Sequence, residues 1–262
     1  MRKLLTSGAV AVGMLLASCT PANRVVENPL IGAANTMTLD FPKIELSDTA
    51  TVLHVDAYFR PHNCIRIDAG TYLLADGQKY MLQGSEGILP DSLFWMPDSG
   101  EASFVLKFGP LPRGTKSFDF IESDCDDCFK LYGVDLTGKK EYPRYPEGLP
   151  RALRKAPEDG PVPEPILAVG TTTVNVRLLG YRRGMVKEVA MYVNSLLNGQ
   201  EEHTAAIDPE SGTATLRFEQ YGTAMAYVSC GPVFGMCWIA PGETLDMYIA
   251  MEAGGRAIVQ RR

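Results

Sequence analysis

The sequence predicts an all-β protein in which two antiparallel, immunoglobulin-like β-sandwich domains are joined by a proline-rich linker. Three observations carry this prediction. Apolar and polar residues alternate in short runs from residue 39 onward, helical periodicity is nearly absent, and 7 of the 18 prolines fall within residues 139–165. Alternation with a period of two is typical of strands that bury one face, and many short strands between turn residues favour a sandwich.

The first domain is expected to span residues 39–138. Residues 51–59 carry an apolar side chain at every second position, ending with Phe59, which predicts a strand with one buried face. Asp76-Gly77 separates two apolar runs, and an Asp-Gly pair in that setting is a strong signal for a hairpin turn. Further alternating runs follow at residues 104–108 and 118–120.

Residues 139–165 are expected to form a semi-rigid linker, because closely spaced prolines fix φ and remove the amide donors that a central strand needs. Two helical turns are expected within this linker, at residues 149–156. A second sandwich is expected over residues 166–262. Its strands are predicted from alternating runs at residues 173–179, 188–193, 213–218, 225–230, 237–240 and 245–249.

The N-terminus has the organisation of a bacterial lipoprotein signal peptide. Arg2 and Lys3 precede an apolar run over residues 4–16, which is too short to cross a bilayer as a helix. The run ends in Leu-Ala-Ser-Cys, which resembles a lipobox, so we expect residues 1–18 to be removed and Cys19 to receive the lipid. Residues 19–38 are expected to be a tether. Several acyl chains, at about 0.8 kcal/mol per buried methylene, make such an anchor effectively permanent.

The residue after Cys19 is Thr20 and not an acidic residue, a pattern that sends many lipoproteins to the outer membrane. The expected location is therefore the cell envelope, lipid-anchored in the outer membrane and facing the periplasm or the cell surface, where conditions are oxidising. Nucleic acid is not an expected partner, because the net charge is −6 and no basic run occurs before Arg261-Arg262.

Cys125 and Cys128 form a C-x-x-C motif, which is compatible with a redox centre, half of a zinc site or a structural disulfide. A thioredoxin-type pair sits at a helix N-terminus that stabilises the thiolate, whereas β-like sequence flanks this one. Acidic neighbours such as Glu122 and Asp124 raise the pKa of a thiol. A structural disulfide is therefore favoured, with redox activity and metal ligation as the alternatives.

The other cysteines and the histidines give weaker signals. Cys230 and Cys237 bracket a turn between two β runs and are expected to form a second disulfide, the alternative being two reduced core cysteines. Cys64 is left over and is expected to be a small buried residue. His54 and His203 are expected to be solvated. No catalytic motif, metal site or cofactor is predicted.

Aromatic residues offer one hint of a binding surface. Phe94 and Trp95 lie in a loop-like stretch, and Trp238 follows Cys237. Each could form an exposed platform for a peptide or a glycan. Packing in the core is the favoured alternative, because large aromatic side chains usually fill the interior of a sandwich.

Several stretches resemble one known family. They are VLHVDAYF at residues 52–59, TYLLADGQKYML at 71–82, FVLKFGPLPRGTKSFDFIES at 104–123 and IAPGETLDMYI at 239–249. With the C-x-x-C motif, they make the chain similar to the N-terminal β-sandwich region of TlpA-like thioredoxin-family lipoproteins of Bacteroidota, from about Cys19 to Met251.

In that family the sandwich modules precede a helical spacer and a thioredoxin-like domain, whose W-C-x-x-C motif performs thiol-disulfide exchange. The resemblance matches Cys125 and Cys128 to the sandwich-domain cysteines, and neither tryptophan of this sequence precedes a C-x-x-C. No counterpart of the thioredoxin-like domain is expected in these 262 residues. The catalytic role is therefore not carried over.

The expected function is that of a non-catalytic, membrane-anchored envelope lipoprotein that acts as a binding or positioning module, for instance beside a thiol-disulfide oxidoreductase system. Two alternatives stay open. One is thiol-disulfide exchange through Cys125 and Cys128, by this chain alone or as part of a larger thioredoxin-family protein. The other is a surface lipoprotein that binds a glycan or a peptide. The expected partners are the membrane, through Cys19, and an envelope protein or such a ligand.

Overall fold

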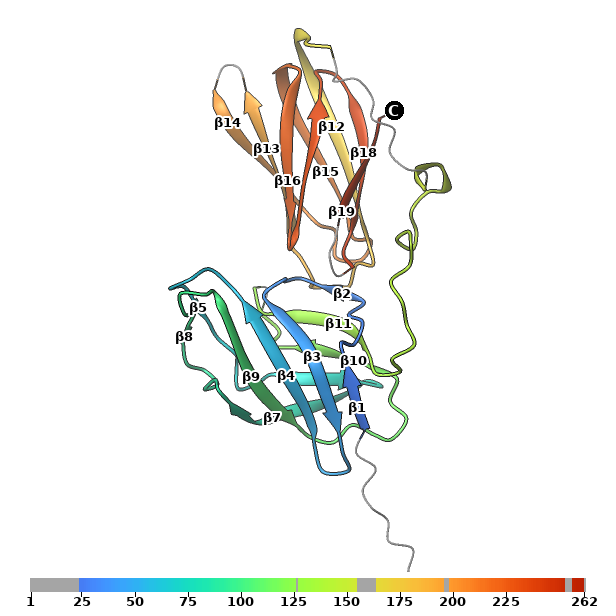
Figure 1. Cartoon of the computed structure of the whole chain (residues 1–262). Helices are drawn as coiled ribbons and strands as arrows, with labels where there is room; N and C mark the ends of the chain where they lie inside the picture. The colour runs from blue at the N-terminus through green and yellow to red at the C-terminus, as the bar shows by residue number, and fades with distance from the viewer. Residues whose placement is uncertain (1–23, 126, 155–163, 196–197, 253–255, 262) are drawn as a thin grey trace, which may run out of the picture.

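A computed structural model describes residues 24–125, 127–154, 164–195 and 198–252, together with the backbone of residues 256–261. These residues form nineteen strands and one short 3-10 turn, Arg151–Leu153, and they contain no α-helix. The all-β fold class is confirmed. In the described part of the chain, no helix is long and apolar enough to cross a membrane. The strands form an N-terminal sandwich, β1–β11, and a C-terminal sandwich, β12–β19 (Figure 1).

The N-terminal sandwich is one nine-stranded sheet that folds over on itself, in the order β1-β3-β4-β9-β7-β6-β10-β11-β2. Strand β7 belongs to both layers, because its first half pairs with β6 and its second half pairs with β9. A short ribbon of β5 and β8 lies beside it. The bounds are β1 Arg24–Glu27, β2 Ala33–Ala34, β3 Leu39–Leu46, β4 Thr51–Tyr58, β5 Cys64–Ile65, β6 Tyr72–Ala75, β7 Gln78–Glu86, β8 Phe94–Trp95, β9 Glu101–Phe108, β10 Ser117–Ile121 and β11 Lys130–Asp135.

Sequence patterns locate the core of this sandwich well. In β4 every second residue is buried, as predicted, but the strand ends at Tyr58 and Phe59 is exposed, so the prediction for Phe59 was wrong. Asp76 and Gly77 form the turn between β6 and β7, both with positive φ, as a type I′ hairpin turn requires. In the interior, the ring of Phe120 packs edge-on against Phe41 and Phe108, at centroid distances of 5.4 and 6.3 Å.

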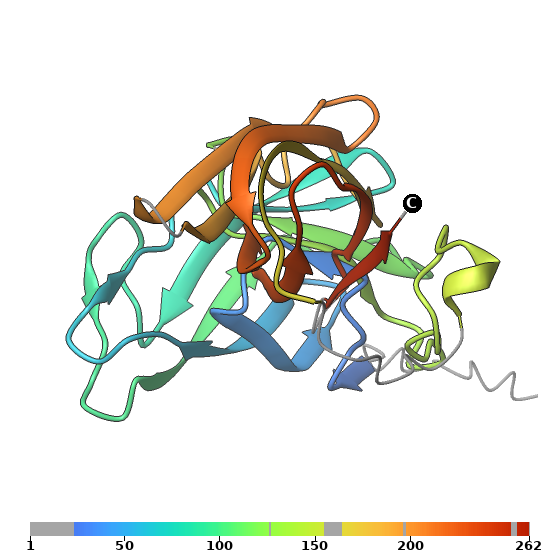
Figure 2. The same cartoon turned by 90° about the horizontal axis from the view of Figure 1, so that it is seen from above.

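The C-terminal sandwich has two four-stranded sheets, β15-β12-β18-β19 and β14-β13-β16-β17, which curve around a shared core (Figure 2). The pairing of β12 with β18 is parallel, whereas the sequence predicted antiparallel sheets. Parallel pairing needs a long connection, and the intervening strands supply it. The bounds are β12 Leu167–Leu179, β13 Glu188–Ser195, β14 Gly199–Ala206, β15 Thr213–Gly222, β16 Ala224–Cys230, β17 Val233–Ile239, β18 Thr244–Ala250 and β19 Arg256–Arg261.

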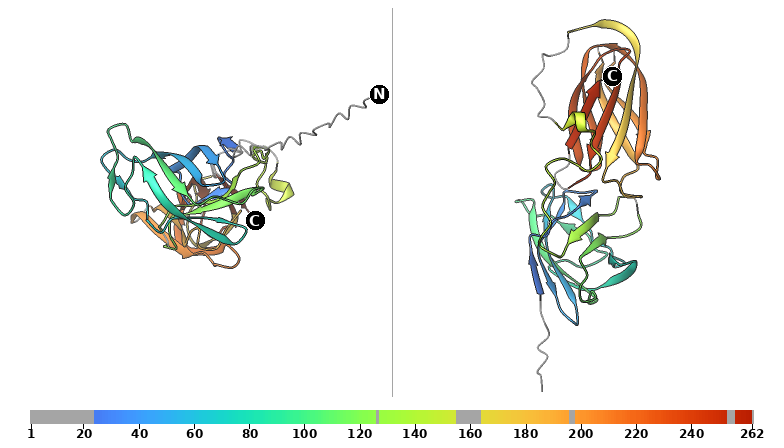
Figure 3. Two further views of the ribbon diagram at one scale, coloured as in Figure 1. Left: turned by 90° about the horizontal axis from the view of Figure 1, so that it is seen from below. Right: turned by 90° about the vertical axis from the view of Figure 1, so that its right-hand side faces the viewer.

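The two sandwiches are stacked end to end and share buried surface (Figure 3). Four residues of the N-terminal sandwich, Ala33, Tyr72, Ile121 and Tyr132, belong to the hydrophobic core of the C-terminal one. Strand β1 begins at the opposite end of the N-terminal sandwich, far from this junction (Figure 1).

The two segments expected to be flexible or semi-rigid are partly built into the fold. Residues 19–38 were expected to be a tether, but β1 and β2 lie within this range and pair with β3 and β11. In the linker, Leu149 is buried and the Tyr142 hydroxyl donates a hydrogen bond to the Ile31 carbonyl at 3.4 Å. Of the helical turns expected over residues 149–156, the described residues form only the single turn Arg151–Leu153.

His203 was expected to be solvated, but it lies half-buried on β14. Its ring stacks on Phe218 at a centroid distance of 4.2 Å, and its Nε2 atom is buried with no hydrogen-bond partner among the described residues. This burial lowers the pKa of His203 below its usual value.

We expect His203 to make the protein less stable as the solution is acidified. The unfolded chain, with a histidine pKa of about 6.5, binds the proton more readily than the folded chain. Above that pH, protonation of His203 does not affect the free energy of unfolding. As the pH falls toward the lower folded-state pKa, the unfolded chain takes up the proton first and the free energy of unfolding decreases. Urea unfolding at about pH 7.5 and about pH 5.5 should show a larger loss for the wild type than for His203→Phe. Equal losses in the two proteins would contradict the assignment.

Candidate functional site

The C-x-x-C motif forms a disulfide, as the sequence favoured. The Cys125–Cys128 bond lies in the loop that joins β10 to β11, with the two Cα atoms 5.3 Å apart. Cys125 is exposed, and Cys128 is buried. Strands lie on both sides of the loop, and no described helix begins there, so the feature that activates a thioredoxin-type cysteine is missing from the described residues around it.

Acidic residues around the disulfide have specific structural roles. Glu122 is buried, and its carboxylate accepts a hydrogen bond from the Phe129 amide at 2.8 Å. Burial raises the pKa of this carboxyl group. The Asp124 carboxylate accepts a hydrogen bond from the Tyr72 hydroxyl at 2.9 Å and lies 3.8 Å from the Lys79 amine. The Glu122–Phe129 bond thus closes the base of the loop, and Asp124 fixes the loop to β6 and β7.

Asn35 holds the strand that follows Cys128. Its side-chain amide donates to the Cys128 carbonyl at 2.8 Å, and its side-chain oxygen accepts from the Lys130 amide at 2.8 Å. The Lys130 side chain is buried, and its amine donates to the carbonyl of Gly184 in the C-terminal sandwich at 2.8 Å. The disulfide therefore adjoins the contact between the two sandwiches, which we call the junction and define by Asn35, Cys128, Lys130 and Gly184.

A pocket of about 520 Å³ opens beside the junction. It contains charges of both signs, with Asp127 and Glu188 opposite in sign to Lys187. Gly231 lies at its edge, where an added Cβ atom would come within 2.7 Å of the Val186 side chain. The residues that line the pocket are Asn35, Asp127, Met185, Val186, Lys187, Glu188 and Gly231. Among the described residues, no group of three or more His, Cys, Asp or Glu is placed to hold a metal ion.

The second predicted disulfide is wrong: Cys230 and Cys237 are not bonded to each other. Residues 231–232 make a tight turn, so Cys230 lies opposite Val233, and Cys237 lies opposite Ala226 further along the hairpin. Cys230 is buried in the core, which raises the pKa of its thiol to about 12. Cys64 is half-buried opposite Trp95 and is not the core residue that the sequence predicted. Cys19 lies outside the described residues.

The aromatic candidates have different environments. Phe94 packs against the core of the N-terminal sandwich, whereas Trp95 has 63% of its surface exposed. Trp238 is also exposed, on β17. Core packing is therefore the wrong prediction for both tryptophans. The structure does not bring them together, because they lie in different sandwiches.

Sequence reasoning missed the surface to which Trp238 belongs. On β17, Phe234, Met236 and Trp238 project from the outer side of the sheet, because Val233 and Ile239, which alternate with them, are buried. The register places Met225 opposite Trp238 and Tyr227 opposite Met236. We call these five residues, Met225, Tyr227, Phe234, Met236 and Trp238, the outer apolar face. Because β16 and β17 are both mainly apolar, their sequences do not show which residues face outward.

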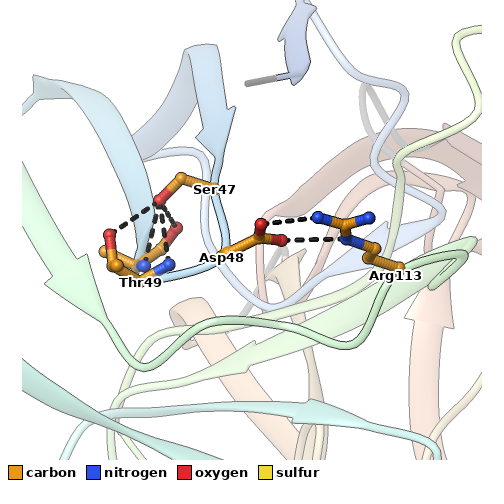
Figure 4. A network of polar contacts seen from close by, with 5 residues as sticks. Ser47, Asp48, Thr49 and Arg113 are labelled. Carbon is orange, nitrogen blue, oxygen red and sulfur yellow. Dashed lines mark hydrogen bonds and ion pairs between the residues drawn. The ribbon is translucent and has the colours of Figure 1, made fainter. Parts of the chain in front are cut away.

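A polar network lies at the other end of the molecule, where β1 begins. Arg113 binds the carboxylate of Asp48 through two nitrogens, one of them at 2.9 Å, and Ser47 closes the neighbouring turn (Figure 4). The Arg113 guanidinium lowers the pKa of Asp48. A pocket of about 210 Å³ lies here, with Arg24 and Leu136 among its lining residues. The pair connects the β3–β4 turn to the loop over residues 111–115.

We expect loss of the disulfide to lower the stability of the protein modestly. Closing so short a loop stabilises the folded state by about 2 kcal/mol on the chain-entropy estimate. Urea unfolding of the Cys125→Ser/Cys128→Ser variant should therefore show a decrease of about that size. Wild-type protein kept under reducing conditions is the matched control and should behave like the variant. An unchanged midpoint in both would show that the bond does not stabilise the fold.

Comparisons of the chain with protein-family models, with curated proteins and with solved structures found no match. The resemblance to TlpA-like lipoproteins therefore stays a prediction.

Proposed function

We propose that this protein is a non-catalytic lipoprotein of the bacterial cell envelope, anchored through Cys19, which binds or positions a partner. The observation that carries the proposal is the structural use of its C-x-x-C motif. Cys128 is buried, Asn35 holds its carbonyl, and the next strand supplies Lys130 to the junction. This arrangement supports a role in fixing two sandwiches relative to each other.

The end-to-end arrangement also supports a positioning role. Only four residues lie between Cys19 and Arg24, where β1 begins. The five residue steps from Cys19 to Arg24 span at most about 17 Å, at about 3.5 Å per residue. A lipid on Cys19 would therefore hold the β1 end of the N-terminal sandwich close to the membrane, with the Asp48–Arg113 pair facing it. The C-terminal sandwich would then point away from the membrane (Figure 3).

Thiol-disulfide exchange is the second candidate function, and one observation favours it. Cys125 is exposed, so an external thiolate could attack its sulfur and release the thiolate of Cys128. The acidic surroundings and the buried position of Cys128 act against this reaction, because both disfavour a thiolate.

We expect Cys19→Ser to release the protein from the membrane. The variant lacks the thiol that accepts the lipid, so it cannot be acylated at this position. After expression of the full chain in a Gram-negative host, wild-type protein should be found in the membrane fraction and incorporate labelled palmitate. The variant should be found in the soluble envelope fraction without label. Cys64→Ser is the matched cysteine control and should behave like the wild type. Membrane association of Cys19→Ser would contradict the anchor.

We expect the purified protein to show no insulin reductase activity above the rate of the reductant alone. The reason is that the attacking cysteine would need a stabilised thiolate, and no helix N-terminus provides this stabilisation within the described loop. Turbidity of insulin in the presence of dithiothreitol measures the rate, and a thioredoxin serves as the positive control. A rate that is present in the wild type and lost in Cys125→Ser would favour the second candidate.

A further inference from the structure

The outer side of the β14-β13-β16-β17 sheet is divided into two chemically different halves. The register places Tyr192 opposite both Glu202 and Tyr227, and Tyr227 opposite Met236, so one row runs across all four strands. Its β16–β17 half is apolar, and its β14 end is acidic. The neighbouring rows have uncharged polar residues on β14 and a large apolar residue on β17. Their outward positions are Gln200, Asn194, Met225 and Trp238 on one side, and Thr204, Ala190, Ser229 and Phe234 on the other.

The apolar half is unusually exposed for side chains of this size. Phe234 and Met236 each have 64% of their surface exposed, although the Phe234 ring stacks on Tyr227 at a centroid distance of 6.0 Å. Contiguous apolar patches on a protein surface mark interaction sites. Aromatic residues and methionine are enriched in protein–protein interfaces, and the flexible methionine thioether adapts to differently shaped apolar side chains.

The polar half of this surface carries two carboxylates among uncharged residues. Glu188 and Glu202 are exposed at outward positions of β13 and β14, and no lysine or arginine occupies an outward position of the described rows. The Glu202 carboxylate accepts a hydrogen bond from the Tyr192 hydroxyl at 3.0 Å, which holds the charge next to the aromatic residues. A complementary ligand therefore needs apolar side chains for one half and positive charges for the other.

We propose that the outer apolar face, together with Glu188 and Glu202, docks an amphipathic protein segment that has an apolar stripe flanked by lysine or arginine. The proposal rests on the proposed function and identifies the partner of the binding module. The charge pattern selects this occupant. An anionic membrane surface would be repelled by the glutamates, and a second copy of a chain with net charge −6 would bring like charges together.

The test uses a synthetic amphipathic helical peptide, with leucine on one face and lysine on the other, and a control peptide with glutamate in place of lysine. We expect the lysine peptide to bind the Cys19→Ser chain with a Kd of order 10 μM, measured by calorimetry, and the glutamate peptide to bind at least about tenfold more weakly. Phe234→Ser/Met236→Ser should weaken binding of the lysine peptide by at least about tenfold, because two exposed apolar contacts are lost.

Two further variants make the test specific. Glu202→Lys should weaken binding of the lysine peptide, whereas Leu89→Ser, which removes a side chain exposed to 70% in the other sandwich, should leave binding unchanged. Both apolar variants change exposed residues, so circular dichroism should match the wild type. The docking proposal is overturned if the two peptides bind equally or if Phe234→Ser/Met236→Ser binds like the wild type.

Two further results would show that the face binds something other than a protein segment, and each would also overturn the proposal. One is an oligosaccharide that changes the tryptophan fluorescence of the wild type but not that of Trp238→Phe, while the lysine peptide does not change it. The other is a dimer in sedimentation experiments that Phe234→Ser/Met236→Ser disrupts. Failure of peptide docking leaves the Cys19→Ser fractionation and the insulin assay unaffected, so it is distinguishable from failure of the proposed function.

Discussion

The hydrogen bond from the Lys130 amine to the Gly184 carbonyl is the interaction on which the arrangement of the two sandwiches depends. A buried ammonium group is costly unless it has a polar partner, and the C-terminal sandwich supplies this partner to a strand of the N-terminal one. Ala33, Tyr72 and Tyr132 add apolar contact around it. Separation of the sandwiches would break this hydrogen bond and expose the shared apolar surface to water, so the two parts are energetically coupled. The disulfide and Asn35 act on the same strand from its other side.

This coupling gives the two ends of the molecule different roles. The end at which β1 begins carries the exposed ion pair between Asp48 and Arg113. Such a pair contributes little to stability, but it fixes the loop over residues 111–115 beside the β3–β4 turn. The far sandwich carries the outer apolar face. A fixed junction keeps this face at a constant orientation relative to the β1 end. A flexible connection between the two sandwiches would let that orientation vary.

The sequence predicts local structure well where a physical signal is local. The alternation in β4 and the Asp76-Gly77 turn are such signals, and both are confirmed. Features that depend on pairing between distant segments are not predictable in this way. Examples are the pairing of residues 24–27 with β3, the separation of Cys230 from Cys237 along a hairpin, and the burial of His203 against Phe218. The outer apolar face was missed for the same reason, because only cross-strand register shows which residues of two neighbouring apolar strands share a side.

The parallel pairing of β12 with β18 has a consequence for how the chain acquires its structure. β12 is an interior strand of its sheet, yet both of its neighbours, β15 and β18, follow much later along the chain. Contacts between residues so far apart in sequence slow folding, since a long loop must close before they form. During synthesis, an emerging β12 would therefore stay without its ladder partners until nearly the whole C-terminal sandwich had been made. Its unpaired backbone groups would then be open to wrong associations, which makes this strand a natural target for a chaperone.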